Sequence, residues 1–195
     1  MSVSNEWEQL LSPDVTRNRL ISASMYITTF ELLKDSIVRR IQDFYFIGLD
    51  KNSSTSNPDH QRKVLSRNKS VLYASLDWLI EIAAIHKSDI EAFERLKTVR
   101  NKLAHELPSI VLGGAELQLT THFEEALALL RKIEVWWIVN VEIATNPDYD
   151  GTEVDESGIV PGPVLMLQLM LEVVAGNSQY LDHYTRAASS RKTEI

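Results

Sequence analysis

Apolar residues recur at intervals of three or four over most of the chain, which is the period of an amphipathic α-helix. In the first long segment the apolar stripe runs through Tyr26, Phe30, Leu33, Ile37, Ile41 and Phe44. Ser12, Pro13 and Asp14 stand before it as a helix cap, a first-turn proline and a first-turn acid. The pattern therefore predicts one long helix from Ser12 to about Tyr45.

The same period predicts four more main helices and two short ones. The main helices are expected over 68–85, 88–107, 117–144 and 163–174, and the short ones over 59–66 and just before Ser189. A polar run at 50–58 and an acidic segment at 146–163 separate some of them. The one strand candidate, Ile110 to Leu112, is short and lies between Pro108 and Gly113.

These elements indicate an all-α fold, an antiparallel bundle of about five main helices. We expect a single domain over residues 1–189 and a frayed tail at 190–195. The sequence has no cysteine, which excludes disulfides and thiolate metal ligands. Its longest apolar run, Val164–Val174, is shorter than the ~20 residues that span a bilayer, so we expect no membrane partner and a cytoplasmic location.

One segment combines helical packing with candidate chemistry. Its apolar stripe is formed by Phe93, Leu96, Leu103 and Leu107. Arg100 falls within this stripe, and Asn101 and His105 share a neighbouring face. A guanidinium in an apolar stripe is costly unless it is paired or faces a wet cleft. The six residues from Arg100 to His105 are therefore the place where function is expected.

The stretch Arg100-Asn101-Lys102-Leu103-Ala104-His105 resembles the motif of the HEPN domain family, in which arginine is followed after four to six residues by histidine. The resemblance implies a metal-independent endoribonuclease without a cofactor. His105 would be the general base or acid, Arg100 would bind the scissile phosphate, and Asn101 would orient one of them. The basic residues Arg95, Lys97 and Lys102 would bind RNA. The net charge of −7 argues against a protein that binds nucleic acid over its whole surface.

The resemblance also implies a toxin or antiphage effector that forms a homodimer and is restrained by an antitoxin or another regulatory partner. Arg100 and His105 lie about 140° apart on an ideal helix, so two copies around a twofold axis are expected to complete one site. Some toxins of the family carry a tyrosine two residues after the motif histidine. Leu107 stands there in this chain, which argues against that subgroup.

Three other interpretations stay open. Arg100 could pair with a buried carboxylate, and the basic residues could pair with the interleaved Glu91, Glu94 and Glu106 to form an ordinary charged surface. A HEPN fold could bind nucleotides or act as a scaffold without cleaving RNA. The chain could also be a non-catalytic helical interaction protein, such as a dimeric regulator of the mannitol-repressor type.

Overall fold

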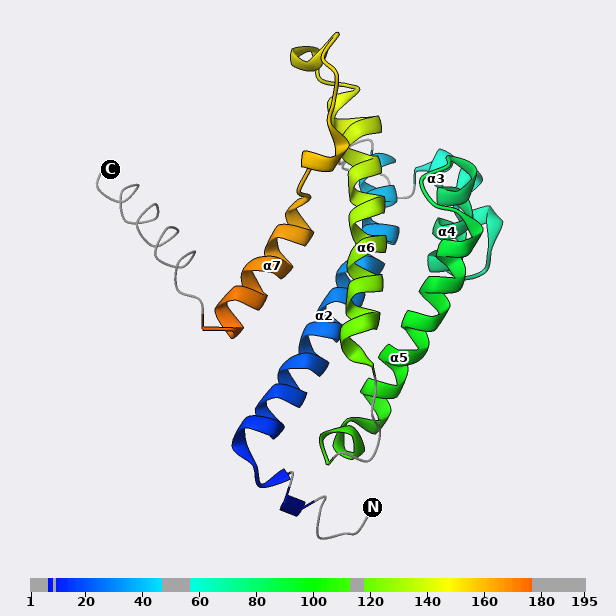
Figure 1. The fold of residues 1–195 in the computed structure, drawn as a ribbon. Helices are drawn as coiled ribbons and strands as arrows, with labels where there is room; N and C mark the ends of the chain where they lie inside the picture. Colours follow the sequence, from blue (N-terminus) through cyan, green and yellow to red (C-terminus); the bar gives the residue numbers. More distant parts are fainter. Residues whose placement is uncertain (1–6, 9, 47–56, 113–117, 177–195) are drawn as a thin grey trace, which may run out of the picture. The chain divides into compact units, whose positions relative to one another are not determined.

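A computed structural model describes residues 7–8, 10–46, 57–112 and 118–176 (Figure 1). The chain divides into two compact units, residues 1–159 and residues 160–195, which we describe separately. The prediction of a single domain over 1–189 stays a prediction. The helix expected before Ser189 and the tail at 190–195 lie outside the described residues.

The predicted all-α class is confirmed, because the described residues form helices and no strand. The helices of the first unit are α2 (Pro13–Phe44), α3 (Pro58–Lys63), η1 (Leu65–Arg67), α4 (Val71–Glu81), α5 (Lys87–Val111), α6 (Leu119–Trp137), η2 (Ile138–Ile143), η3 (Pro147–Tyr149) and η4 (Glu156–Gly158). The second unit contains α7 (Gly162–Val174). Among them η2 is a π-helix, and η1, η3 and η4 are short 3₁₀ turns.

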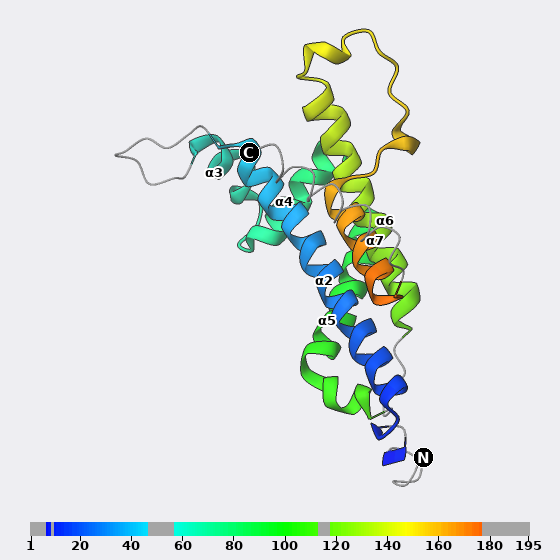
Figure 2. The ribbon, with the colours of Figure 1, turned by 90° about the vertical axis from the view of Figure 1, so that its left-hand side faces the viewer.

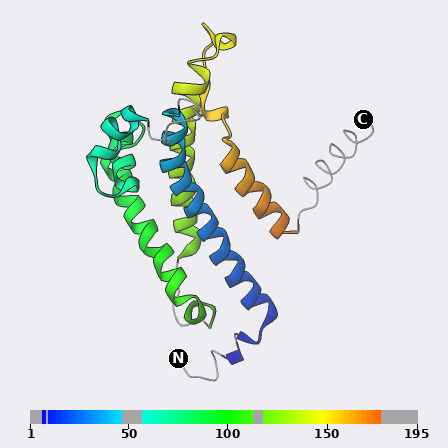
Figure 3. The ribbon, with the colours of Figure 1, turned by 180° about the vertical axis from the view of Figure 1, so that it is seen from behind.

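The core of the first unit forms around α2, which packs against α4, α5 and α6. In Figures 1 and 3, α5 runs antiparallel to α2 and α6, whereas α2 and α6 run in the same direction. Figure 2 shows α3 and α4 beside the C-terminal end of α2. The predicted stripe of α2 is buried up to Ile41, and Phe30 stacks on Phe93 of α5 with 5.5 Å between ring centroids. Each such side chain contributes about 1.5–3 kcal/mol on burial.

The helix α4 ends earlier than its apolar pattern predicts. Ala83 adopts a left-handed backbone with φ of 57°. Its N–H donates to the Ile80 carbonyl at 3.0 Å, and the N–H of Ala84 donates to the Leu79 carbonyl at 2.9 Å. These are the two hydrogen bonds of a Schellman motif, in which glycine is the usual residue at the left-handed position. The absence of glycine here is why the sequence pattern did not reveal this helix end.

The helix α5 continues through Pro108, where the sequence predicted its end, and reaches Val111. Proline lacks an N–H, so the Ala104 carbonyl loses its backbone donor at this point. The last turn nevertheless stays helical, with the Leu112 N–H donating to the Pro108 carbonyl at 3.0 Å. Buried Ile110 anchors that turn in the core, and the candidate strand at 110–112 is therefore wrong.

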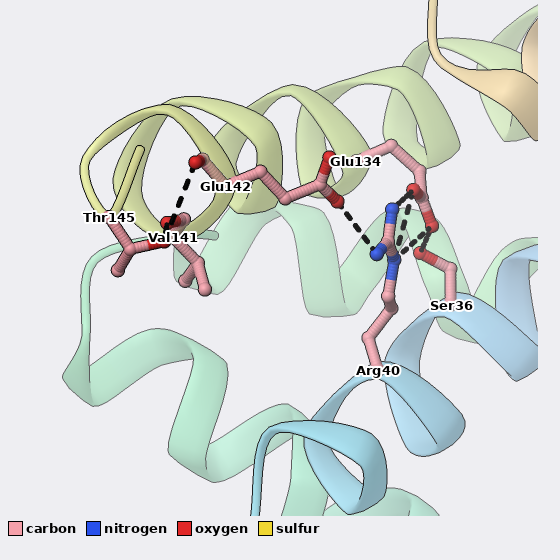
Figure 4. Close-up of polar contacts among 6 residues, drawn as sticks. All are labelled: Ser36, Arg40, Glu134, Val141, Glu142 and Thr145. Carbon is pink, nitrogen blue, oxygen red and sulfur yellow. Dashed lines mark hydrogen bonds and ion pairs between the residues drawn. The ribbon is translucent and has the colours of Figure 1, made fainter. Parts of the chain in front are cut away.

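The helix expected over 117–144 begins at Leu119 in the described residues and changes its hydrogen-bond register near its end. It is α-helical up to Trp137 and π-helical over η2. Two polar side chains donate to backbone carbonyls around this π turn. Asn140 Nδ2 donates to the Trp136 carbonyl at 2.9 Å. Thr145 Oγ1 donates to the Val141 carbonyl at 2.6 Å (Figure 4).

In the second unit, α7 begins with Pro163 in its first turn, as the sequence predicts. Gly176 follows the helix with φ of +78°, a left-handed conformation suited to a residue just past a helix end. Its N–H donates to the Val173 carbonyl at 3.1 Å. In the described ranges, no helix is both long enough and apolar enough to cross a membrane.

Candidate functional site

The motif lies in the second half of α5, a helix that is fixed at its beginning by polar contacts. The His86 backbone N–H donates to the Asp89 carboxylate at 2.7 Å, and Lys132 of α6 donates to the same carboxylate at 2.5 Å. Further along, Phe93, Leu96 and Leu103 are fully buried. Their burial against the core fixes which residues of α5 face solvent.

Arg100 pairs with Glu31 of α2. Its Nη2 and Nε atoms both donate to Glu31 Oε1, at 2.7 and 3.1 Å, and Lys34 donates to Glu31 Oε2 at 3.2 Å. The side chains of Arg100 and Glu31 are 35% and 40% exposed. The guanidinium in the apolar stripe is therefore tolerated for two reasons. It has an anionic partner, and it lies at the edge of the helix packing, where it is partly exposed to solvent.

The backbone of α5 is tied to α2 one turn before Arg100. Fully buried Tyr26 donates its hydroxyl hydrogen bond to the Leu96 carbonyl at 2.8 Å. That carbonyl is also the one that accepts the Arg100 amide in an α-helix. Burial, and next the negative charge of Glu125, raise the pKa of the Tyr26 hydroxyl, so it remains a donor at neutral pH.

The carboxyl group of Glu31 stays charged beside its cations. Burial alone would raise its pKa, but hydrogen bonds from Arg100 and Lys34 outweigh that effect and lower the pKa. Of the two hydrogen bonds from Arg100 to Glu31, one uses Nε and the other uses Nη2. A guanidinium has five N–H donors, so Arg100 can hold Glu31 and still offer Nη1 to a second anion.

The other two motif residues face solvent. Asn101 and His105 are exposed, and neither forms a hydrogen bond or ion pair with another residue in the described part of the chain. His105 lies five residues after Arg100, about 140° around the helix and ~7.5 Å along it. No hydrogen bond joins Arg100 to His105 within the described ranges, so one chain does not present them as a contacting pair.

Of the three residues predicted to bind RNA, two have partners within the chain. Arg95 forms an ion pair with Glu125 of α6. Lys97 donates to the Tyr73 hydroxyl at 2.6 Å and lies 4.8 Å from the centre of its ring. This hydrogen bond raises the pKa of Lys97. The third residue, Lys102, is exposed.

A second polar cluster was not predicted from the sequence, and it joins α2 to the end of α6 (Figure 4). Glu134 is only 2% exposed. Its carboxylate accepts hydrogen bonds from Ser36 at 2.6 Å and from Arg40 Nη2 at 2.6 Å. Arg40 Nη1 also donates to Glu142 of η2 at 2.9 Å. The hydrogen bonds to Glu134, followed by those to Glu142, raise the pKa of Arg40 despite its partial burial.

Of the two missed carboxylates, Glu134 lies on the apolar face of α6, where a charge needs a partner, and that placement was the available signal. Glu31 lies off the buried stripe of α2 and is 40% exposed, so its position gave no such signal. The partner of Glu134, Arg40, is 94 positions away in the sequence, and Glu31 is 69 positions from Arg100. Helix periodicity carries no information on which residues meet across such separations.

A cavity of about 640 Å³ lies between η2 and the loop that follows it. Its charged lining residues are Glu142, Glu153 and Asp155, beside Tyr149 and the apolar Ile138 and Ile143. In the residues that the structure describes, no group of three histidine, aspartate or glutamate side chains is arranged to hold a metal ion.

Comparisons with protein-family models, with curated proteins and with solved structures found no match to this chain. The chemistry of the motif therefore rests on its own residues. These are a half-exposed guanidinium held by a carboxylate and an exposed imidazole on the same helix. Such groups can bind a phosphodiester and move a proton.

Proposed function

We propose that this protein is a HEPN-like, metal-independent endoribonuclease centred on Arg100, Asn101 and His105 of α5. The observation that carries the proposal is the state of Arg100. It is held by Glu31, it is accessible to solvent, and it has N–H donors left for a phosphate. The exposed Asn101 and His105 on the same helix supply an amide and an imidazole.

In this proposal His105 removes the proton from a ribose 2′-hydroxyl. The 2′-oxygen then forms a bond to phosphorus while the bond from phosphorus to the 5′-oxygen breaks, and the leaving oxygen takes up a proton from a general acid. Arg100 donates hydrogen bonds to the phosphate oxygens as negative charge builds on them. Water is the simplest source of that proton, because Arg100 and His105 are both accessible to solvent.

The separation of Arg100 and His105 around α5 is the reason to propose a homodimer. Two copies that bring their α5 helices together around a twofold axis would place Arg100 of each beside His105 of the other. Each shared site would then contain a guanidinium and an imidazole that one helix cannot aim at the same phosphate. An active protein of this kind would also require a restraining partner, such as an antitoxin.

Glu31 has a positioning role in this proposal. It fixes the guanidinium through two bonds and compensates its charge before RNA binds. Replacement by glutamine keeps a hydrogen-bond acceptor but removes the negative charge. We expect Glu31→Gln to lower the cleavage rate by weakening the orientation of Arg100, with little effect on stability because a half-exposed ion pair contributes about 0–1 kcal/mol.

The alternative function is a non-catalytic helical interaction protein. The observation that favours it is the internal pairing of the basic residues. Arg95 and Lys97 already have partners in Glu125 and Tyr73, and Arg100 has Glu31. In this alternative the ion pairs only stabilise the helix packing, and RNA is not a ligand.

The deciding experiment expresses the wild type, Arg100→Ala and His105→Ala in cells and measures growth and the integrity of total RNA. The controls are Arg39→Ala, an exposed arginine paired with Asp35, and His86→Ala, an exposed histidine at the start of α5. We expect the wild type and both controls to cleave RNA even with EDTA present in the purified assay. Loss of His105 should slow cleavage about 10²–10⁴-fold. Intact RNA with the wild type would reject the nuclease and favour the interaction protein.

Co-expression of Arg100→Ala with His105→Ala tests the shared site. Mixed dimers would contain one site with both groups intact, so about a quarter of the wild-type activity should return if chains pair at random. A site formed within one chain would stay inactive in the mixture. That result would refute the dimeric arrangement and leave the nuclease itself standing.

A further inference from the structure

Arg40 joins two carboxylates that belong to consecutive helical segments. Glu134 lies in α6 and is buried, and Glu142 lies in η2 with its side chain 52% exposed (Figure 4). Arg40 Nη2 is 2.6 Å from Glu134 Oε2, and Arg40 Nη1 is 2.9 Å from Glu142 Oε1. One guanidinium therefore contacts positions eight residues apart.

An uninterrupted α-helix would not align these two carboxylates. Eight steps of 100° leave residues 134 and 142 about 80° apart around the axis. A π turn encloses one more residue in each hydrogen-bonded ring, and its rotation is only ~80° per residue. Four α steps to residue 138 and four π steps beyond it add up to about 720°, which is two full turns. The π register thus places Glu142 on the same side of the helix as Glu134.

We propose that Arg40 is a latch that holds the end of α6 in its π-helical register. The buried carboxylate of Glu134 fixes the guanidinium, and the guanidinium captures Glu142 only when the intervening turn is π-helical. A π turn is rare, and it occurs mostly as a single turn in a helix that is otherwise α-helical. When Glu142 is released, residues 138–143 return to the α register, and Glu142 turns by about 80° relative to Glu134.

The latch controls the shape of the cavity beside η2, because Ile138, Glu142 and Ile143 all line it. The far part of the cavity wall is fixed independently. Arg131 Nη2 donates to the backbone carbonyls of Glu156, Ser157 and Ile159 at 3.0, 3.1 and 3.2 Å. Rotation of the η2 residues would therefore move their wall of the cavity while the wall held by Arg131 stays in place. It would also change which side chains face the cavity.

The test compares the full-length wild type with Glu142→Gln and Arg40→Lys. The control is Glu124→Gln, which removes an exposed charge from α6 itself. Nuclear magnetic resonance couplings across hydrogen bonds identify the carbonyl that accepts each amide of residues 138–146. Lysine carries a single compact ammonium, so we expect it to stay with Glu134 and to release Glu142.

We expect the i→i+5 bonds of the wild type and of Glu124→Gln to become i→i+4 bonds in both latch variants. Amide exchange in this segment should become about two- to fivefold faster, the change expected for loss of a partly exposed ion pair. A π register that persists in Glu142→Gln would overturn the proposal. Glu142→Gln decides alone if Arg40→Lys fails to fold, because an exposed substitution leaves the buried pair intact.

Discussion

Replacement of Arg40 by methionine tests how much of the fold depends on the buried carboxylate of Glu134. Methionine retains the length of the side chain and removes the charge. Glu134, at 2% exposure, would keep only the hydrogen bond from Ser36. Removal of one partner from a buried ion pair costs about 3–5 kcal/mol. Arg40 is 35% exposed, so water reaches the pair and the lower end of that range applies.

We therefore expect Arg40→Met to lower the free energy of unfolding by about 3 kcal/mol. Urea titration followed by circular dichroism measures this loss. The slope of the free energy of unfolding against urea concentration should stay unchanged. The double variant Arg40→Met with Glu134→Leu removes both charges and should regain most of the loss. Arg39→Met is the matched control, because its exposed pair with Asp35 contributes less than about 1 kcal/mol.

Equal losses in Arg40→Met and Arg39→Met would show that Glu134 is hydrated in solution, and the reasoning would fail. A double variant less stable than Arg40→Met would also contradict it. In that case the leucine would be poorly packed, or the carboxylate would be stabilised by groups other than Arg40.

Two further predictions concern positions away from the motif. Ala83→Gly should raise the free energy of unfolding by about 0.5 kcal/mol, because the left-handed conformation costs alanine roughly 1–2 kcal/mol and the greater freedom of unfolded glycine offsets part of that gain. Thermal unfolding measures this gain in stability. The control is Ala128→Gly, at an exposed position inside α6, which should lower the stability of the protein. Burial lowers the pKa of His60, so the unfolded chain binds its proton first as the pH falls through about 6.5. The free energy of unfolding should therefore decrease as the pH falls below that value. Urea titrations at a series of pH values should show a smaller decrease for His60→Gln.

The sequence allowed the helices to be predicted because burial follows the helical period. The stripe of α2 is buried from Tyr26 to Ile41, as predicted. Helix ends and registers were harder to predict. The left-handed Ala83 ends α4 without a glycine, and the π turn of η2 depends on an arginine from another helix. Neither feature leaves a signal in the helical period of the sequence.

The site was predictable only in part for the same reason. Arg100, Asn101 and His105 stand together in the sequence, and the anomaly of a charge on an apolar face pointed to Arg100. Its partner Glu31 belongs to a helix far away along the chain. The partners of Arg95 and Lys97 were equally invisible, since both lie on other helices.

The contacts of Tyr26 and Glu31 with α5 have a consequence for how the motif tolerates change. Tyr26 fixes the backbone at Leu96, and Glu31 fixes the side chain of Arg100, so one helix determines both the position and the aim of the guanidinium. A segment carrying Arg100 to His105, transplanted without α2, would keep the residues and lose their geometry. Substitutions of Tyr26 or Glu31 in α2 would in turn alter the geometry of the motif without changing any of its own residues.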